Sequence, residues 1–154
     1  MARGRLKAKG RSERGSFVAI PHEILNHPNF TGLTPYAVKL LIDLYSQFRG
    51  QNNGDLSAPW SRMSKRGWRS KGTLHSALKE LRKTGWIIVS RHGSLNRCSL
   101  YAVTFKPVDD CKGKIDIPST TVAPGNWKIT ENRTLYVYQA GTPTVPVKHA
   151  EAVN

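Results

Sequence analysis

The chain has few acidic residues, few cysteines and no long apolar run. It contains 10 Asp and Glu residues against 24 Lys and Arg residues, which gives a formal net charge of +14 over 154 residues. No segment approaches the 18 or so consecutive apolar residues of a membrane-spanning helix. No apolar segment follows the charged residues 1–7, so we expect no secretory signal. We therefore expect a cytoplasmic protein, associated with the nucleoid and not with a membrane.

The low cysteine content and the missing catalytic motifs argue against a disulfide-stabilised protein, a zinc protein and an enzyme. Cys98 and Cys111 are too few for a disulfide framework and lack the spacing of a zinc site. We expect both to be small apolar fillers in a reducing compartment. The chain has no G-x-S-x-G, P-loop or H-E-x-x-H motif and no cluster of carboxylates. The sequence thus predicts no enzyme activity, no cofactor and no metal ion.

The positive charge is concentrated in two segments. Residues 1–16 carry six cations and one acid, residues 60–97 carry ten cations and one acid, and the rest of the chain is close to neutral. Charge that serves only solubility would be spread over the chain, whereas charge concentrated in this way favours a docking surface for nucleic acid. An ordinary solvated surface, or attraction to anionic lipid, is the alternative interpretation.

The spacing of apolar residues predicts two main helices. The first covers residues 34–48, with Thr34 as its N-cap and Pro35 as its first residue. The second covers residues 70–84, with Ser70 as its N-cap and Gly85 as the left-handed residue that ends it. Their apolar stripes consist of Leu33, Ala37, Leu40, Leu41, Leu44 and Phe48, and of Leu74, Ala77, Leu78 and Leu81.

Shorter elements are predicted around these helices. Residues 21–28 suit one or two helical turns with Pro21 at the first position, and residues 55–57 suit a single-pairing strand. We expect Ser57 to cap a short helix over residues 59–66 that ends at Gly67.

We expect that short helix to bury Trp60 and Met63. After the second main helix, β-branched and aromatic residues at 86–91 and 99–105 predict a hairpin with a loop at 92–96.

The order helix, short strand, short helix, turn, helix, hairpin is that of a winged helix-turn-helix. We therefore predict an α+β fold of three helices plus a β-hairpin wing over residues 17–106. A disordered basic arm, residues 1–16, precedes it. A Pro-rich extension, residues 107–154, comes after it and ends in a loose tail. Within the extension, Trp127 is expected to anchor the segment and residues 134–138 to form one more strand.

In such a fold the second main helix enters the major groove of DNA, while flanking cations contact phosphates. The predicted recognition residues are Ser70, Lys71, Thr73, His75, Ser76, Lys79, Arg82 and Lys83. The predicted wing and flanking phosphate contacts are Arg62, Lys65, Arg66, Arg69, Arg91, His92 and Arg97. The predicted arm contacts are Arg3, Arg5, Lys7, Lys9, Arg11 and Arg14.

The aromatic residues among these cations admit two interpretations. Trp60, Trp68 and Trp86 could stack on bases of a single strand, or could fill a small core. We expect Trp60 and Trp86 to lie in the core, and we leave both interpretations open for Trp68 because it falls in the turn between two helices.

The same residues carry a family resemblance. The chain resembles the winged helix-turn-helix domain of phage and plasmid proteins, including replication initiators and repressors. The resemblance lies in the pattern Gly67-Trp68-Arg69-Ser70, then Thr73-Leu74, Ala77-Leu78 and Leu81, then Gly85-Trp86-Ile87. Residues 101–114 are similar to the segment after the wing in small helix-turn-helix proteins of bacterial mobile elements. The resemblance covers residues 17–114 and implies a recognition helix at 70–84 and a wing at 86–105.

The sequence therefore predicts a non-enzymatic protein that binds double-stranded DNA, as a transcriptional regulator or a replication-origin binder. The alternative is a protein–protein inhibitor or adaptor that uses the same scaffold on a host factor. Binding of RNA or single strands is a third alternative. Two partners stay open for the extension: a second copy of this chain, which would give a homodimer, and a host protein.

Overall fold

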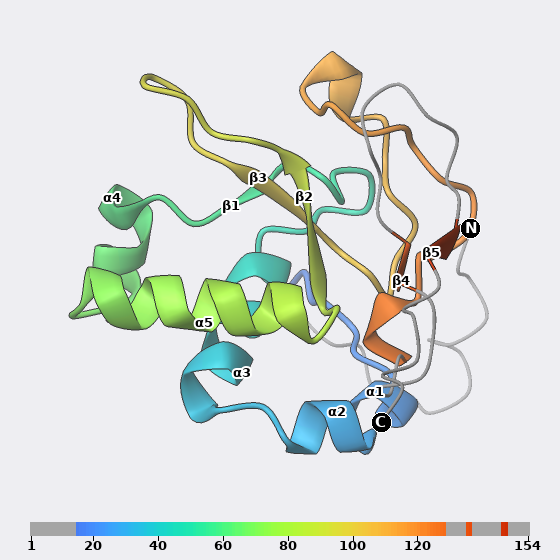
Figure 1. The fold of residues 1–154 in the computed structure, drawn as a ribbon, viewed down its shortest axis with the longest axis horizontal. Helices are drawn as coiled ribbons and strands as arrows, with labels where there is room; N and C mark the ends of the chain where they lie inside the picture. The colour runs from blue at the N-terminus through green and yellow to red at the C-terminus, as the bar shows by residue number, and fades with distance from the viewer. Residues whose placement is uncertain (1–14, 129–134, 137–145, 148–154) are drawn as a thin grey trace, which may run out of the picture.

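The structure is a computed structural model that describes residues 15–128 and two short strands at 135–136 and 146–147. It combines helices with an antiparallel sheet, which confirms the predicted α+β class (Figure 1). Almost the whole predicted basic arm, residues 1–14, lies outside the described residues. Within the described part, no helix has the length and apolar character needed to cross a membrane.

Two short helices, α1 (His22–Leu25) and α2 (Pro28–Thr31), precede the first main helix, α3 (Pro35–Tyr45). The prediction that Pro21 is the first helical residue is wrong, because its extended ψ of 146° makes it the N-cap. Thr34 caps α3 as predicted, and its hydroxyl oxygen accepts a hydrogen bond from the Ala37 amide.

Helix α3 ends at Tyr45, three residues before the predicted end at residue 48. The amides of Gln47 and Phe48 donate to carbonyls three residues back, so the chain tightens into turns beyond α3. Such i to i−3 bonds satisfy the last carbonyls of a helix but do not continue it.

The strand β1 (Leu56–Ser57) leads into a short helix, α4 (Trp60–Met63), and a 3₁₀ turn, η1 (Ser64–Arg66). The prediction that Ser57 caps this helix is wrong. Ser57 pairs with Leu100 in the sheet, its hydroxyl accepts a hydrogen bond from Arg62, and Pro59 holds the N-cap position. The segment ends at Gly67, as predicted, and Gly67 has a left-handed conformation with φ 86°.

The second main helix, α5 (Lys71–Lys83), matches its prediction closely. The Ser70 hydroxyl accepts a hydrogen bond from the Thr73 amide, and three of the four stripe residues, Leu74, Ala77 and Leu81, are buried. Leu78 is partly buried and packs against the core. Gly85 has φ 80°, which confirms the predicted left-handed end.

The hairpin strands β2 (Ile87–Arg91) and β3 (Leu100–Val103) join β1 in an antiparallel sheet with the order β1-β3-β2. Both strands are shorter than predicted. The register shifts between Val89 and Arg91, so Ser90 bulges out of the ladder. The buried Ser90 hydroxyl donates to the Gly54 carbonyl, and its own carbonyl accepts from the Asp116 amide.

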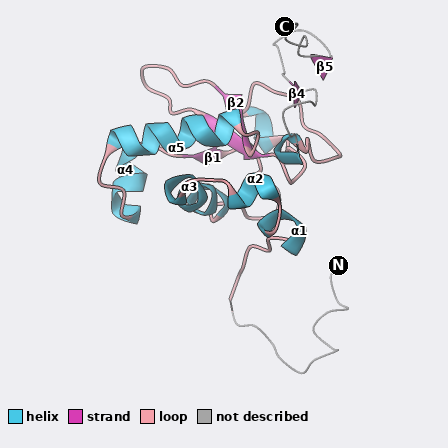
Figure 2. Cartoon of the chain, turned by 60° about the horizontal axis from the view of Figure 1, so that its bottom comes forward, coloured by secondary structure: helices cyan, strands magenta, loops and turns pink. Residues whose placement is uncertain are grey.

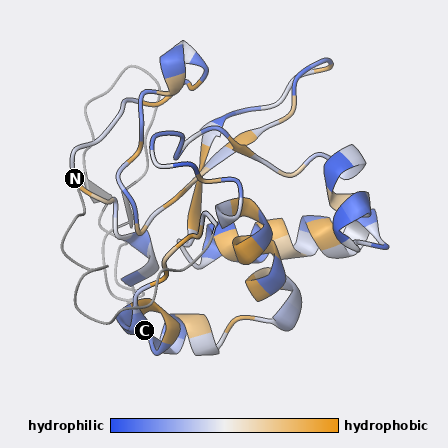
Figure 3. Cartoon of the chain, turned by 180° about the vertical axis from the view of Figure 1, so that it is seen from behind, coloured by the Kyte–Doolittle hydropathy of each residue, from blue (hydrophilic) through white to orange (hydrophobic). Residues whose placement is uncertain are grey.

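The core lies between the sheet and helices α3 and α5, which pack against each other in both views (Figures 1 and 2). Hydrophobic positions alternate with hydrophilic ones along α5, as expected for a helix with one buried side (Figure 3). Trp86 and Trp68 are buried, whereas Trp60 is only half-buried. Trp60 packs against the core, so its predicted place there is confirmed, although α4 buries it only in part. Trp68, for which both interpretations were open, belongs to the core.

The first part of the extension, residues 107–128, packs on the body through two short turns, η2 (Cys111–Gly113) and η3 (Asn126–Lys128). Trp127 stacks on Trp86 at 5.3 Å between ring centroids, which confirms its predicted role as an anchor. The buried Asn53 side chain donates to three carbonyls between Val103 and Pro107.

Farther along, β4 (Leu135–Tyr136) falls within the predicted strand at 134–138 and pairs with β5 (Pro146–Val147). The rest of the predicted tail lies outside the described residues.

Candidate nucleic-acid interface

Helix α5 carries a row of exposed polar residues opposite its buried stripe, which we call the outer face of α5. Because the stripe repeats every three or four residues, the residues between its members are turned to solvent. The outer face consists of Lys71, Gly72, His75, Ser76, Lys79, Arg82 and Lys83, all exposed, with half-buried Thr73 at its edge. Most of the predicted recognition residues are thus brought together on one surface.

The outer face has no acidic residue, because the one acid of α5 is used elsewhere. The carboxylate of Glu80 accepts hydrogen bonds from the Thr34 amide at 2.8 Å and from the Thr34 hydroxyl at 2.6 Å. These groups lie at the N-terminus of α3, where the helix dipole favours negative charge. Within the described residues, the α5 cations form no ion pair, so their charge is uncompensated on this side.

The predicted phosphate contacts near α4 divide into two groups. Lys65 and Arg69 are exposed, and neither forms an ion pair with a described residue. Arg66 and Arg62 are engaged within the protein. Nε of Arg66 donates to Asp43 Oδ1 at 2.8 Å, and Nη2 forms an ion pair with the same oxygen at 2.8 Å. Nη1 of Arg62 donates to the Ser57 hydroxyl at 2.9 Å and to Gln47.

Asp43 is the buried centre of this second group. Its side chain accepts hydrogen bonds from Lys39, Arg66 and the Trp68 indole, each at 2.8 Å. Burial by itself would raise the pKa of Asp43, but these hydrogen bonds and the Arg66 charge outweigh it, so its pKa is lowered. Asp43 therefore fixes the turn between α4 and α5 against α3, and with it the direction in which α5 leaves that turn.

The hairpin contributes fewer free cations than predicted. Arg91 donates to the backbone carbonyls of Lys114 and Cys98 at 3.2 Å, so it braces the base of the hairpin and does not project from its tip. His92 and Arg97 are exposed, and so is Leu95, of which 99% is accessible.

The prediction for the cysteines is wrong at Cys98, which is exposed because it lies where the hairpin has left the core. Cys111 is half-buried, and burial together with the charges of Asp55 and Asp109 raises the pKa of its thiol. The predicted arm contacts, Arg3 to Arg14, lie outside the described residues. Among the described residues, no group of three or more His, Cys, Asp or Glu residues could hold a metal ion.

Sequence reasoning missed the roles of Glu80 and Asp43. The spacing of Lys39 and Asp43, four residues apart on one helix, signals an ion pair but does not indicate that it is buried. The partner of Glu80 lies 46 residues away, so no local pattern could have identified it.

Comparison of the chain with protein-family models, with curated proteins and with solved structures gives no match. The resemblance to winged-helix proteins of mobile elements therefore stays a prediction from the sequence. The chemistry of the surface is the remaining guide to function.

Proposed function

We propose that this chain is a winged helix-turn-helix protein of a mobile element that binds double-stranded DNA without catalysing a reaction. The order of its elements supports this fold: α3, β1, α4, a turn at Gly67, α5, and the hairpin β2–β3. So does the sheet order β1-β3-β2, in which the two hairpin strands are neighbours and β2 contacts α5, as expected of a wing.

The observation that carries the proposal is the outer face of α5. It presents Lys71, Lys79, Arg82 and Lys83 without a carboxylate among them, because Glu80 is turned to Thr34. A surface that only needed to be soluble would gain from mixed charge, whereas a duplex offers a dense row of phosphates to a purely cationic one.

The geometry suits the major groove. An α-helix with its side chains is about 10–12 Å across and the major groove is about 12 Å wide, so α5 can lie in the groove, with its 13 residues extending over about 20 Å. His75 and Ser76 offer short hydrogen-bonding groups for base edges. Lys79 and Lys83, one helical turn apart, reach phosphates farther along.

The cations on neighbouring elements then act in two ways. Lys65 and Arg69 lie before α5 and extend the phosphate contacts, and Arg97 and His92 do so from the wing. Arg62, Arg66 and Arg91 hold the surface in shape through their internal hydrogen bonds. In this proposal the biological output is repression or recruitment at a promoter or a replication origin.

A titration of fluorescent 30-base-pair duplexes at several salt concentrations tests the proposal. The double variant Lys79→Ala and Lys83→Ala should bind several-fold more weakly and lower the slope of log affinity against log salt by roughly 2, since each neutralised phosphate contributes about 0.9. A matched control removes two exposed lysines outside the basic segments, Lys112→Ala and Lys128→Ala, and should keep the slope.

An unchanged slope in the first variant would refute the assigned face. Preference for duplexes from the protein's own upstream region would support a specific regulator or origin binder. If the wild type binds no duplex, and a host protein is retained on it after nuclease treatment, the adaptor alternative is favoured.

A further inference from the structure

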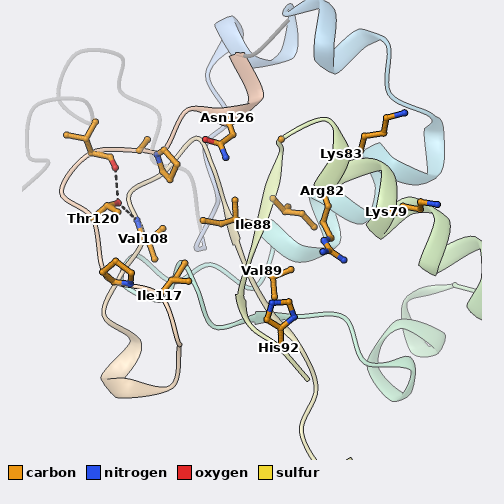
Figure 4. Close-up of a pocket in the computed structure, with 16 residues that line it drawn as sticks. Lys79, Arg82, Lys83, Ile88, Val89, His92, Val108, Ile117, Thr120 and Asn126 are labelled. Atoms are coloured by element: carbon orange, nitrogen blue, oxygen red, sulfur yellow. Dashed lines mark hydrogen bonds between the residues drawn. The ribbon is translucent and has the colours of Figure 1, made fainter. Parts of the chain in front are cut away.

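A preformed groove lies beside the C-terminal half of α5, on the side toward the extension. Its volume is about 830 Å³. One wall carries Lys79, Arg82 and Lys83, strand β2 forms the middle, and residues 108–126 form the opposite wall (Figure 4). None of the sequence patterns indicated it, because its two walls are separated along the chain.

The lining of the groove is largely apolar. It includes Ile88, Val89, Val108, Ile117, Pro118, Val122 and Pro124. Val122 is 74% exposed and lies on the wall opposite the lysines. An apolar surface that stays accessible inside a concave site is typical of small-molecule binding sites.

Hydrogen bonds hold the wall formed by the extension in place. The Thr120 hydroxyl accepts from the Val108 amide at 2.9 Å and donates to the Val122 carbonyl at 2.8 Å (Figure 4). The Thr120 amide donates to the Val108 carbonyl at 2.8 Å. With Val108 buried and Trp127 stacked on Trp86, this wall is fixed to the body, so the groove does not have to be formed by its occupant.

The charge around the groove selects the occupant. Lys79, Arg82 and Lys83 lie along one wall and His92 lies near one end, and no Asp or Glu occurs among the described residues that line the groove. An anionic group placed against the α5 wall would therefore meet cations only, and an apolar body would lie along β2 and the extension. Arg and Lys are the usual donors to carboxylates.

We propose that this groove binds a small organic anion with an apolar body, such as a medium-chain carboxylate. The size of the groove falls within the range of about 300–1,000 Å³ usual for small-molecule sites. The carboxylate would lie at Lys79, Arg82 and Lys83, and the chain would cover Ile88 and Val122.

The site also has a consequence for DNA, which rests on the proposed function. Lys79, Arg82 and Lys83 belong both to the outer face of α5 and to the groove, so a bound anion neutralises charges that the duplex needs. The anion and the duplex would therefore compete, and the anion would release the protein from DNA.

Decanoate is a suitable probe, measured by isothermal titration calorimetry on the full chain below its micellar concentration. Decanol has the same chain without charge, and decyltrimethylammonium has it with the opposite charge. We expect one decanoate per chain, bound at least 10-fold more tightly than either of the other two. Equal binding of the cationic probe would overturn the proposal.

The variant Val122→Glu places an acid on the exposed rim of the groove without opening the core, and should weaken decanoate binding at least 10-fold. Leu95→Glu is the matched control, because it makes the same change at an exposed aliphatic residue of the hairpin tip and should leave the affinity unchanged. Circular dichroism verifies that both variants fold. Unchanged binding by Val122→Glu would also overturn the proposal.

Adding decanoate to the duplex titration separates the two proposals. Calorimetric binding of decanoate without any duplex binding would leave the groove in place and refute the proposed function. Duplex binding without decanoate binding would refute the groove alone. If both bind, decanoate should raise the apparent Kd of the wild type for DNA several-fold, and the effect should be absent in Val122→Glu.

Discussion

Replacing Asp43 should remove the hydrogen bonds that support α5 without changing any residue on the outer face of α5. Asp43 is 4% exposed and accepts hydrogen bonds from Lys39, Arg66 and Trp68. In Asp43→Ala the Trp68 indole N–H loses its partner inside the core, which costs about 1–3 kcal/mol. Lys39 and Arg66 are about two-fifths exposed and can regain water, so their loss adds less than the 3–5 kcal/mol typical of a fully buried pair. We expect a total loss of about 3 kcal/mol.

A loss of this size lowers Tm by roughly 10 °C in a protein of this length. Asp43→Asn keeps one oxygen for Trp68 but removes the charge and turns an NH2 donor toward Arg66 in place of the second oxygen, so it should cost about half as much. Urea denaturation followed by tryptophan fluorescence gives both values. A cost below about 1 kcal/mol for Asp43→Ala would refute the idea that Asp43 holds the α4–α5 turn against α3.

Asp43 also makes the stability of the folded protein depend on pH, in a direction that follows from its pKa. Its folded-state pKa is lowered below the ordinary value of 3.8, so the stability it contributes is present above that value and is lost as the pH falls through the lower folded pKa. The difference in stability between wild type and Asp43→Asn should therefore be constant from pH 7 to 5 and should narrow below about pH 4. Asp110→Asn, at an exposed carboxyl without a capping hydrogen bond, is the matched control for the substitution itself.

Three further substitutions test the ends of the main helices. Gly85→Ala should cost about 3 kcal/mol in urea denaturation, because Gly85 has φ 80° and an added Cβ would lie 2.5 Å from the Asn126 carbonyl oxygen. Gly72→Ala, in the exposed first turn of α5, should instead stabilise the protein by up to about 1 kcal/mol. Equal effects at both glycines would contradict this account. Thr34→Ala removes both the cap of α3 and the hydroxyl that donates to Glu80, so we expect a loss of about 1–2 kcal/mol by the same measurement, and a change within experimental error would exclude a role for this cap.

The helices and their ends could be predicted because their determinants are local. Thr34, Ser70 and Gly85 act on backbone groups within a few residues, so their effects can be read from the sequence. The same reasoning failed at Ser57, where pairing with Leu100 in the sheet prevailed over a local capping preference. It placed Trp60 correctly against the core but overestimated how far the ring is buried.

The sequence by itself determined the two main helices, the hairpin and the segregation of positive charge, since these depend on neighbours within a turn or on composition alone. Only the tertiary structure decided which charges remain free. Glu80 accepts a hydrogen bond from Thr34, which lies 46 residues away in the sequence. Arg66 donates to Asp43, and Arg91 donates to the Lys114 carbonyl, each over a separation of 23 residues. Such partners are set by packing of distant elements, and no periodicity encodes them. For the same reason only the folded chain brings the extension opposite α5 and forms the groove between them.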